Sequence, residues 1–149
     1  MDAKMLDGYR IVVADWATCA ADAAAVRHEV FVLEQQVPLE EEMDERDAVC
    51  VHAVVYGPEG GAVGTGRLLP DGHIGRMAVR KSQRGRGLGS LLLTRLVDEA
   101  RQCGHLEVVL AAQVHAQDFY AAHGFLAEGP VFLDAGIDHV HMRRVLRKR

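Results

Sequence analysis

The chain has 149 residues, 49% of them hydrophobic, and a formal net charge of −4 at pH 7. This length and apolar content predict a single domain, residues 1–149, with its own hydrophobic core. The net negative charge argues against nucleic-acid binding, because domains that bind nucleic acid usually carry a basic excess. No apolar run approaches the roughly 18 residues that span a bilayer, and the N-terminal Met-Asp-Ala-Lys-Met has no apolar signal core. We therefore expect no membrane association and a cytoplasmic location.

The three cysteines, Cys19, Cys50 and Cys103, lie far apart and form no Cys-x-x-Cys pair. An odd number at such spacing suits reduced thiols better than a disulfide or zinc framework. We predict that all three are small core residues or half-buried residues.

The N-terminal third of the chain predicts a strand, a helix and an acidic loop. Apolar and β-branched residues fill positions 9–16, and an alanine-rich stretch at 18–33 carries apolar residues at helical spacing. Residues 34–47 are acidic, contain Pro38 and lack regular apolar spacing, so we expect a loop with one helical turn.

The middle of the chain predicts an antiparallel meander of three strands. Residues 49–56 and 62–69 are strand-like, and the Gly-Pro-Glu-Gly-Gly between them supplies the positive φ angles of a hairpin turn. After a second turn at Pro70-Asp71-Gly72, residues 74–79 form the third strand, which leads into a glycine-rich segment.

A helix and a strand follow the glycine-rich segment. Apolar residues recur along one face of residues 88–104, which predicts a helix that ends at Gly104. The stripe comprises Leu88, Leu91, Leu92, Leu96 and Ala100. The continuous apolar run at 106–112 predicts a central strand buried on both faces. The strand-helix-strand order makes it parallel to the strand at 74–79, through a right-handed crossover.

The last part of the chain predicts a short helix at 116–122, closed by Gly124, and a final strand at 137–146. The chain then ends in the basic Arg147-Lys148-Arg149. An apolar face on the terminal strands would suit either the core or a homodimer interface, so both alternatives stay open.

The glycine-rich segment, Gln83-Arg84-Gly85-Arg86-Gly87-Leu88-Gly89, opens directly onto the predicted helix. Its glycines let the backbone turn amide N–H groups inward without Cβ clashes, next to a helix N-terminus. Its two arginines add positive charge where a diphosphate would lie. The segment therefore predicts an anion-binding site.

Two common phosphate-binding loops do not match this segment. A P-loop needs a Lys after its last glycine, and none follows Gly89. A dinucleotide-binding loop needs its third glycine one residue later and an acidic residue at the end of the next strand, which here ends at Gln113. A glycine-rich helix entry without a ligand is the remaining alternative.

Two blocks of sequence resemble the GNAT superfamily of acyl-CoA N-acyltransferases. They are Arg84-x-x-Gly87-x-Gly89, between a strand and an amphipathic helix, and Phe119-Tyr120-x-x-x-Gly124-Phe125, about thirty residues later. The resemblance extends to the ElaA-like branch and covers most of the chain. It includes Arg27-x-x-Val30-Phe31 with Glu34-Gln35, Gly66-Arg67-Leu68, and Gly136-Ile137 with His139 and Met142. It implies an α+β fold with a mixed, mostly antiparallel sheet flanked by helices, whose central parallel strands splay apart around a cofactor cleft.

The same resemblance implies a site for acetyl-CoA, the cosubstrate of N-acetyl transfer. The residues that would hold it are Met77, Ala78, Val79, Arg84, Gly85, Arg86, Gly87, Leu88, Gly89 and Ser90. Main-chain groups of Met77 and Val79 would hydrogen-bond the pantetheine arm. An N–H near Ala78 or Val79 would stabilise the oxyanion that forms when an amine attacks the thioester.

Tyr120 is the expected catalytic donor to the departing thiolate. Proton transfer from a phenol with a pKa near 10 to the thiolate of a thiol with a pKa near 8.5 is unfavourable by roughly 2 kcal/mol. Full proton transfer and hydrogen-bond donation therefore both stay open. The alternative is a core aromatic that packs beside Phe119.

The base that deprotonates the incoming ammonium is harder to assign, because many relatives have a glutamate where this chain has Arg76. The candidate catalytic residues are Glu34 and His139. His141 shares a strand face with His139, but two ligands fall short of a metal site and the chemistry needs none, so we expect no metal.

Acidic residues in the segment that the family places over the acceptor mouth would attract a cationic amine, or they form a solvated face. They are Glu34, Glu40, Glu41, Glu42, Asp44 and Asp47. Arg67 could instead meet a substrate carboxylate or project into an ion pair. We expect transfer of an acetyl group to a primary amine of a small molecule or peptide, by direct attack in a ternary complex. The alternatives are a non-catalytic acyl-CoA-binding sensor and a protein-interaction domain.

Overall fold

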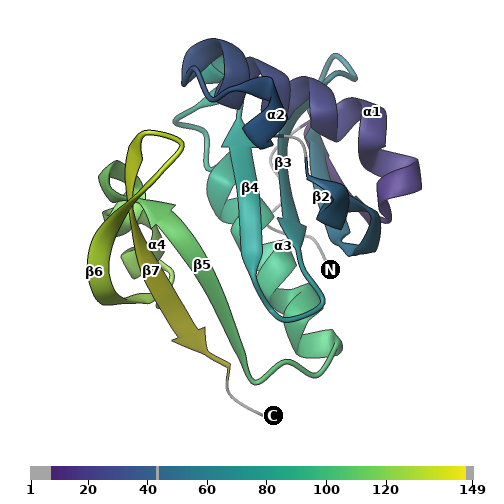
Figure 1. Cartoon of the computed structure of the whole chain (residues 1–149). Helices are drawn as coiled ribbons and strands as arrows, with labels where there is room; N and C mark the ends of the chain where they lie inside the picture. The colour runs from purple at the N-terminus through teal and green to yellow at the C-terminus, as the bar shows by residue number, and fades with distance from the viewer. Residues whose placement is uncertain (1–7, 43, 147–149) are drawn as a thin grey trace.

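The computed structural model describes residues 8–42 and 44–146, which form two β-sheets and several helices (Figure 1). The elements, in chain order, are β1 (Arg10–Ala14), α1 (Trp16–Arg27), the π-helical turn η1 (His28–Glu34), α2 (Leu39–Glu42), η2 (Glu45–Val49), β2 (Val51–Tyr56), β3 (Ala62–Leu68), β4 (Ile74–Val79), η3 (Lys81–Gln83), α3 (Leu88–Gln102), β5 (Glu107–Gln113), η4 (Val114–Ala116), α4 (Gln117–Ala122), β6 (Leu126–Asp134) and β7 (Ile137–Val145). The N-terminal Met-Asp-Ala-Lys-Met and the basic C-terminal end lie outside the described residues. Within the described residues, no helix is both long enough and apolar enough to cross a membrane.

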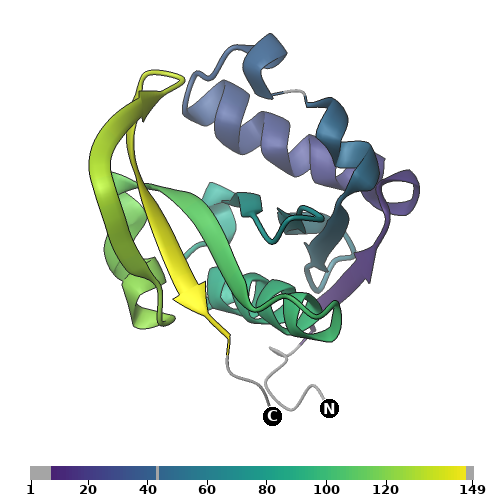
Figure 2. The ribbon, with the colours of Figure 1, turned by 60° about the horizontal axis from the view of Figure 1, so that its bottom comes forward.

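Strands β1 to β4 form an antiparallel sheet in sequence order, which confirms the predicted meander of β2, β3 and β4. The predicted hairpin joins β2 to β3, with Val51 opposite Leu68 and the Gly57 N–H donating to Gly61 O at 2.9 Å. Helix α1 covers one face of this sheet and α3 covers the other (Figure 2). Both faces of the sheet are therefore buried.

The helix predicted at 18–33 has two parts. Helix α1 begins after Asp15, whose side chain accepts the Thr18 N–H at 3.0 Å. It passes without a break into η1, where the turn widens to π-helical bonding, and the helical segment ends before Gln36, which has a φ of 62°. Such wide turns often occur at functional sites.

Strands β5, β7 and β6 form a second antiparallel sheet in that order. Strands β4 and β5 run parallel and meet near their starts, through a bridge between His73 and Val109 and a hydrogen bond from Val109 N–H to Gly72 O at 3.2 Å. Beyond that point they diverge (Figure 1). The predicted pair of splayed parallel strands, and with it the predicted α+β class, is confirmed.

The prediction that residues 106–112 form a strand buried on both faces is wrong. Val108, Leu110 and Ala112 are buried, whereas Glu107 and Ala111 on the opposite face are exposed. Helices α3 and α4 pack on one side of the second sheet, so only alternate residues of β5 enter the core.

Strand β6 has no counterpart among the predicted elements. Its residues are almost all exposed and Gly129-Pro130 interrupts it, so neither alternation nor an apolar run marks it as a strand. It pairs with β7, with an irregular register between Glu128 and Phe132. Pairing with β7, rather than its own composition, makes this segment a strand.

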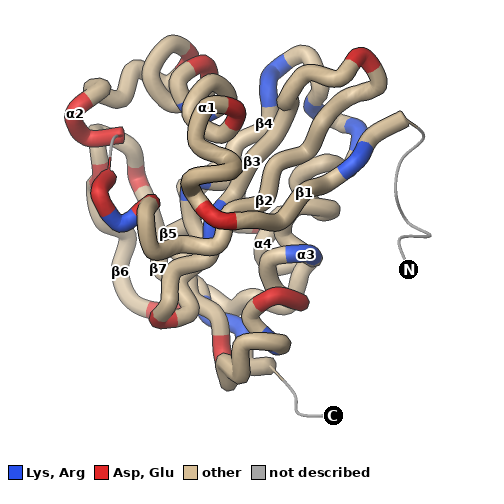
Figure 3. Tube along the Cα trace, turned by 90° about the vertical axis from the view of Figure 1, so that its right-hand side faces the viewer, with Lys and Arg blue, Asp and Glu red and all other residues tan. Residues whose placement is uncertain are grey.

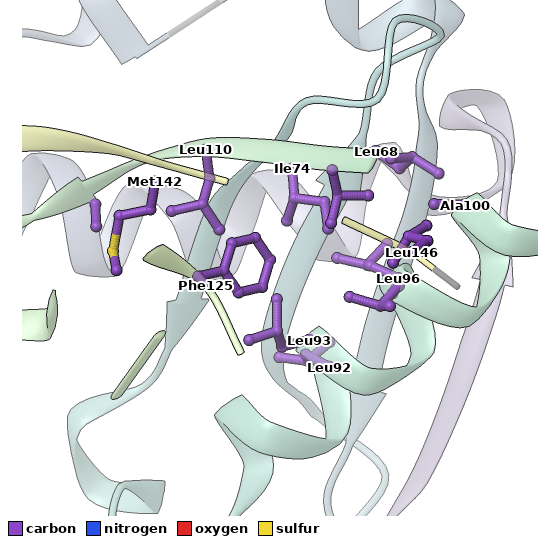
Figure 4. Close-up of a cluster of buried hydrophobic side chains, with 14 of the residues drawn as sticks. Leu68, Ile74, Leu92, Leu93, Leu96, Ala100, Leu110, Phe125, Met142 and Leu146 are labelled. Carbon is purple, nitrogen blue, oxygen red and sulfur yellow. The ribbon is translucent and has the colours of Figure 1, made fainter. Parts of the chain in front are cut away.

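The main core lies between α3 and the two sheets (Figure 4). Leu92, Leu93 and Leu96 of α3 point toward Phe125 and Ile74. The predicted stripe of α3 is buried, apart from one half-buried leucine at position 91.

Of the three cysteines, Cys19 and Cys50 are buried, as predicted. Cys103 is exposed, contrary to the prediction, because it caps the C-terminal end of α3 beyond the core.

Candidate functional site

The candidate site starts at the glycine-rich segment, here called the glycine loop (residues 83–89). Gly85 and Gly87 have φ angles of 80° and 82°, which residues with a Cβ adopt only at a cost. Helix α3 begins at Leu88, and the Leu91 N–H donates to Gly87 O at 3.1 Å. The N–H groups that precede Leu91 in this first turn have no acceptor within the helix and are therefore available to an anion.

A pocket of about 460 Å³ extends between the glycine loop, β4 and α4. It is lined by Met77, Ala78, Val79, Gln83, Arg84, Gly85, Gly87, Leu88, Gly89, Ser90, Ala116, Phe119 and Tyr120. All of the predicted cofactor residues except Arg86 line this pocket. Sequence reasoning missed Gln83, Ala116 and Phe119 as pocket residues, although Phe119 belongs to the second family-like block.

The two arginines of the glycine loop have different surroundings. Arg84 donates to both carboxylate oxygens of Glu34 at 2.6 Å and, through Nε, to Val79 O at 2.9 Å. The hydrogen bonds from Arg84 lower the pKa of the Glu34 carboxyl group. Arg86 is exposed, and its Nη1 lies 3.5 Å from the hydroxyl group of Tyr9. Because Glu34 compensates the charge of Arg84, the groups that this loop leaves available to an anion are its backbone amides and the exposed Arg86.

Strand β4 has an irregular backbone where it reaches the pocket. Arg76 has a φ of 51°, and the pairing of β4 with β3 is interrupted there. A Cβ on Gly66 would lie 2.7 Å from Met77 Sδ, so a side chain opposite this bulge would displace Met77. Because Met77 Sδ is the far part of a flexible side chain, such a shift costs little, so a glycine at position 66 is favoured rather than required.

The far edge of β4 offers main-chain groups to the pocket. The Arg80 N–H donates to Val63 O at 2.8 Å on the β3 side. Because successive N–H groups along a strand alternate between its two edges, the Val79 N–H points toward the edge that diverges from β5.

Tyr120 comes from α4 and lines the same pocket. Its ring packs edge-on against Phe119 and Phe125, with centroid distances of 5.0 and 6.1 Å. Burial raises the pKa of its phenol to about 12, so the hydroxyl group stays protonated at neutral pH. Tyr120 is thus a core-packed aromatic residue that also lines the pocket.

His139 is 9% exposed and lies on β7 opposite Gln113 of β5. Its Nδ1 is 2.7 Å from Ile137 O. A carbonyl oxygen can only accept, so Nδ1 carries the proton, and Nε2 of the neutral ring is left as an acceptor. Phe132 stacks on both His139 and His141, with ring centroids 5.9 and 4.5 Å apart.

Among residues 8–42 and 44–146, no group of three or more His, Cys, Asp or Glu side chains is placed to hold a metal ion.

A hydrogen bond connects the end of η1 to β5 across the opening between the sheets. Gln113 donates through Nε2 to Gln35 Oε1 at 2.9 Å. Directly paired residues of antiparallel strands point to the same face, so His139 lies on the side of the second sheet that faces η1. Only the tertiary structure reveals this link, because the two glutamines are far apart in the chain.

The segment after η1 and its partners form a buried ion-pair network, here called the arginine–carboxylate cluster. It comprises Arg27, Arg46, Arg67 and Arg76 with Glu42, Asp44 and Asp47. Arg27 donates to Glu42 at 2.6 Å and to Asp47 at 2.8 Å, and Arg67 donates to Asp47 and Asp44 at 2.8 Å. Figure 3 shows the acidic positions of this segment, in red, close to basic positions in blue.

These contacts change the expectation that the acidic segment attracts a cation. Burial by itself would raise the pKa of Asp44 and Asp47, but hydrogen bonds from the arginines lower both values below their ordinary range. The charges of Glu42, Asp44 and Asp47 are compensated inside the protein. Of the other predicted residues, Glu34, Glu40 and Glu41 are exposed, and Glu34 is paired with Arg84. Glu42, Asp44 and Asp47 are therefore neither a free cation site nor a solvated face, whereas both alternatives still apply to Glu40 and Glu41.

A family model described as an acetyltransferase (GNAT) domain matches residues 17–146. The chain belongs to the GNAT acetyltransferase family. It is 42% identical over 127 residues to YjcF of Bacillus subtilis, named as an uncharacterized N-acetyltransferase, and the match covers 83% of this chain and 90% of YjcF. The family implied by the two sequence motifs is thus confirmed.

Solved structures share the GNAT fold. Escherichia coli ElaA superposes with a TM-score of 0.81 at 24% identity, covering 91% of this chain and 99% of ElaA. The structure of yncA from Salmonella typhimurium with its cofactor acetyl-CoA has a TM-score of 0.69 at 23% identity, and 95% of each chain is covered. The agreement with ElaA extends over nearly the whole chain, as the resemblance implied.

As a GNAT acetyltransferase, this protein is an acyl-CoA-dependent acyltransferase that uses acetyl-CoA as its cosubstrate. Such an enzyme needs two adjoining sites, one for the cosubstrate and one for the amine. The pocket beside the glycine loop is a candidate for the cosubstrate site.

Proposed function

We propose that this GNAT acetyltransferase transfers the acetyl group of acetyl-CoA directly to a primary amine of a small molecule or peptide, with both substrates bound together. The observation that carries the proposal is the continuous pocket formed by the glycine loop, the free edge of β4 and Tyr120. A chain of donors in this order suits a ligand with a diphosphate at one end and a thioester at the other.

The glycine loop is the proposed diphosphate site. Its N–H groups from Gly85 to Ser90, with the N-terminus of α3, supply donors to the phosphate oxygens. The main-chain groups of Met77 and Val79 bind the pantetheine arm along the free edge of β4. Ala78 and Leu88 contribute to the apolar wall of the pocket.

The amine nitrogen attacks the thioester carbonyl carbon, so a C–N bond forms and the carbonyl oxygen becomes an oxyanion. The Val79 N–H on the free edge of β4 is the proposed donor to this oxyanion. The C–S bond then breaks and the sulfur leaves as a thiolate. Tyr120, whose phenol stays protonated, stabilises the thiolate by donating a hydrogen bond.

His139 is the proposed base that takes the proton of the attacking amine. Its Nε2 is an acceptor because Nδ1 is committed to Ile137 O. Glu34, the other candidate, has both carboxylate oxygens bound to Arg84, and its pKa is lowered, so it is a weaker base than a free carboxylate. We assign Glu34 the positioning of Arg84 instead.

Three further expectations belong to this proposal. The enzyme acts as a single domain, in the cytoplasm, and its acceptor is a small molecule or a peptide that carries a primary amine. A homodimer remains compatible with the exposed apolar residues of β6, which include Leu126, Val131 and Leu133.

Calorimetric titration of acetyl-CoA, followed by thiol release with a panel of primary amines, tests the proposal. We expect saturable binding and thiol release that depends on the amine. Absence of binding would refute the diphosphate site. Binding without turnover of any amine would instead support the non-catalytic sensor, which the absence of a glutamate at position 76 makes worth testing.

A further inference from the structure

Arg76 differs from the other arginines of the arginine–carboxylate cluster in how weakly it is bound. Its Nη2 donates to Glu41 O at 3.4 Å, and its contacts with the carboxylates of Glu42 and Asp44 are both 3.6 Å. Its buried Nε has no hydrogen-bond partner among the residues that the structure describes. The terminal nitrogens belong to a half-buried guanidinium whose contacts are long, so a ligand can offer them a closer acceptor.

The neighbouring arginines are closed to ligands. The side chains of Arg27 and Arg67 are 3% and 4% exposed, and both hold carboxylates at 2.8 Å, whereas 27% of the Arg76 side chain is exposed. Arg67 also has an unpaired Nε, but its two terminal nitrogens are occupied by Asp47 and Asp44. Arg67 therefore projects into ion pairs, and a substrate carboxylate can reach Arg76 instead.

The carboxylates of the cluster are shared unevenly, and Arg76 has the weakest contacts with them. Arg27, Arg67 and Arg76 face three carboxylates, while Arg46, whose side chain is 62% exposed, also pairs with Asp44. Asp44 also accepts from Arg46 at 3.0 Å, which leaves it less available to Arg76. Burial and the nearby positive charges of Arg67 and Arg27 lower the pKa of Arg76, which shows that its charge is in an unfavourable environment.

The position of Arg76 on β4 places it beside the reacting end of the pocket. Met77, Ala78 and Val79 line the pocket, and Arg76 precedes them by one position, or about 3.3 Å along a strand. Val79, the proposed oxyanion donor, lies three positions from Arg76, or about 10 Å along a strand, so the chain reaches Arg76 beyond the residues that line the pocket. The bulge at Arg76, with its φ of 51°, sends this side chain toward the acidic segment.

We propose that Arg76 binds a carboxylate of the acceptor, so that the acceptor is a small primary amine that also carries a carboxylate, as an amino acid does. The terminal N–H groups of Arg76, of which Nη2 has only long contacts of 3.4 and 3.6 Å, would donate to the oxygens of this carboxylate. This inference rests on the proposed function and specifies its acceptor class.

Matched amines with and without a carboxylate test the inference directly. Histidine with histamine, tyrosine with tyramine, and ornithine with putrescine differ within each pair by one α-carboxylate. We expect kcat/KM to be about 10- to 100-fold higher for the preferred carboxylated amine than for its decarboxylated partner. Equal values, or a preference for the decarboxylated partner in all pairs, would overturn the inference.

Variants separate recognition from folding. Arg76→Gln should abolish the preference while it changes kcat/KM for the decarboxylated amine by less than about threefold, and Arg76→Lys should retain only part of it. Arg46→Gln, which removes another arginine that contacts Asp44, is the matched control and should leave the preference intact. An equal loss for both members of a pair in Arg76→Gln would show that Arg76 only stabilises the fold.

A binding measurement keeps this test independent of turnover. If acetyl-CoA binds but no amine is acetylated, the proposed function fails, and the same amines are then titrated by calorimetry into protein saturated with coenzyme A. Binding that requires the carboxylate and is lost in Arg76→Gln would still support the carboxylate site. Binding that does not distinguish the members of any pair, or no binding at all, would refute it.

Discussion

The glycine loop and the arginine–carboxylate cluster lie on either side of the proposed site, but they prepare it for ligands in opposite ways. The loop offers backbone N–H groups that helix geometry leaves free, and its donors come from consecutive residues. The cluster is built from side chains of α1, β3, β4 and the acidic segment, and most of its charges already compensate one another. A local loop can thus offer anion donors from consecutive residues, whereas we propose that discrimination between acceptors depends on Arg76, the most weakly paired arginine of an assembled network.

The largest expected effect comes from breaking the cluster. Asp47→Asn should lower the free energy of unfolding by about 3–5 kcal/mol, because Arg27 and Arg67 would lose a buried partner. Urea unfolding measures this change. Asp98→Asn, which removes an exposed ion pair with Arg101, is the control and should change stability by about 0.5 kcal/mol or less. Equal effects of the two substitutions would mean that the cluster does not hold this side of the site together.

The second-largest expected effect concerns Tyr120, the proposed hydrogen-bond donor to the thiolate. Tyr120→Phe should lower kcat by about 100-fold and leave the acetyl-CoA Kd unchanged, because it removes the donor to the thiolate but keeps the ring in its packing. Steady-state kinetics and calorimetry measure the two quantities. Tyr56→Phe, which removes a hydroxyl bonded to Asp22 at 2.5 Å, should leave kcat unchanged. A kcat unaffected by Tyr120→Phe would leave Tyr120 with its packing role alone.

The third effect tests whether the glycine loop binds through its backbone. Gly87→Ala forces an alanine into a φ of 82°, at a cost of about 1–2 kcal/mol, and should weaken acetyl-CoA binding by about tenfold. Gly60→Ala is a matched control, because Gly60 has a φ of 93° and, like Gly87, no atom within 4 Å of an added Cβ. It should affect stability but not binding. Weaker binding in both variants would point to general destabilisation.

The smallest effect is the pH dependence of stability. The pKa values of Asp44 and Asp47 lie below their unfolded values, so their ion pairs stabilise the folded state above an unfolded pKa of about 3.9. This stability is lost as the pH falls through the lower folded values, by about 1.4 kcal/mol per pH unit for each proton. Unfolding experiments between pH 7 and pH 2 should show a shallower acid dependence in Asp47→Asn than in the wild type. An identical acid dependence would contradict the lowered pKa of Asp47.

Several features of the site could be predicted from sequence because they depend on neighbours in the chain. The glycine loop combines positive φ angles with the start of a helix that its own apolar stripe predicts. The hairpin between β2 and β3 follows from its turn residues and flanking apolar runs. The spacing of one short motif singles out Tyr120, and this residue does line the pocket.

The sequence by itself thus determined most of the elements and the family, and it predicted the glycine loop as an anion site, since these depend on patterns over a few neighbouring residues. Only the tertiary structure decided that β5 is buried on one face and that the exposed segment of β6 is a strand. It also decided which charges of the acidic segment are compensated, because Arg27, Arg67 and Arg76 reach that segment from distant positions in the chain. The sequence gives the number of charged side chains, whereas the folded structure decides which of them are paired with each other and which remain available to a ligand.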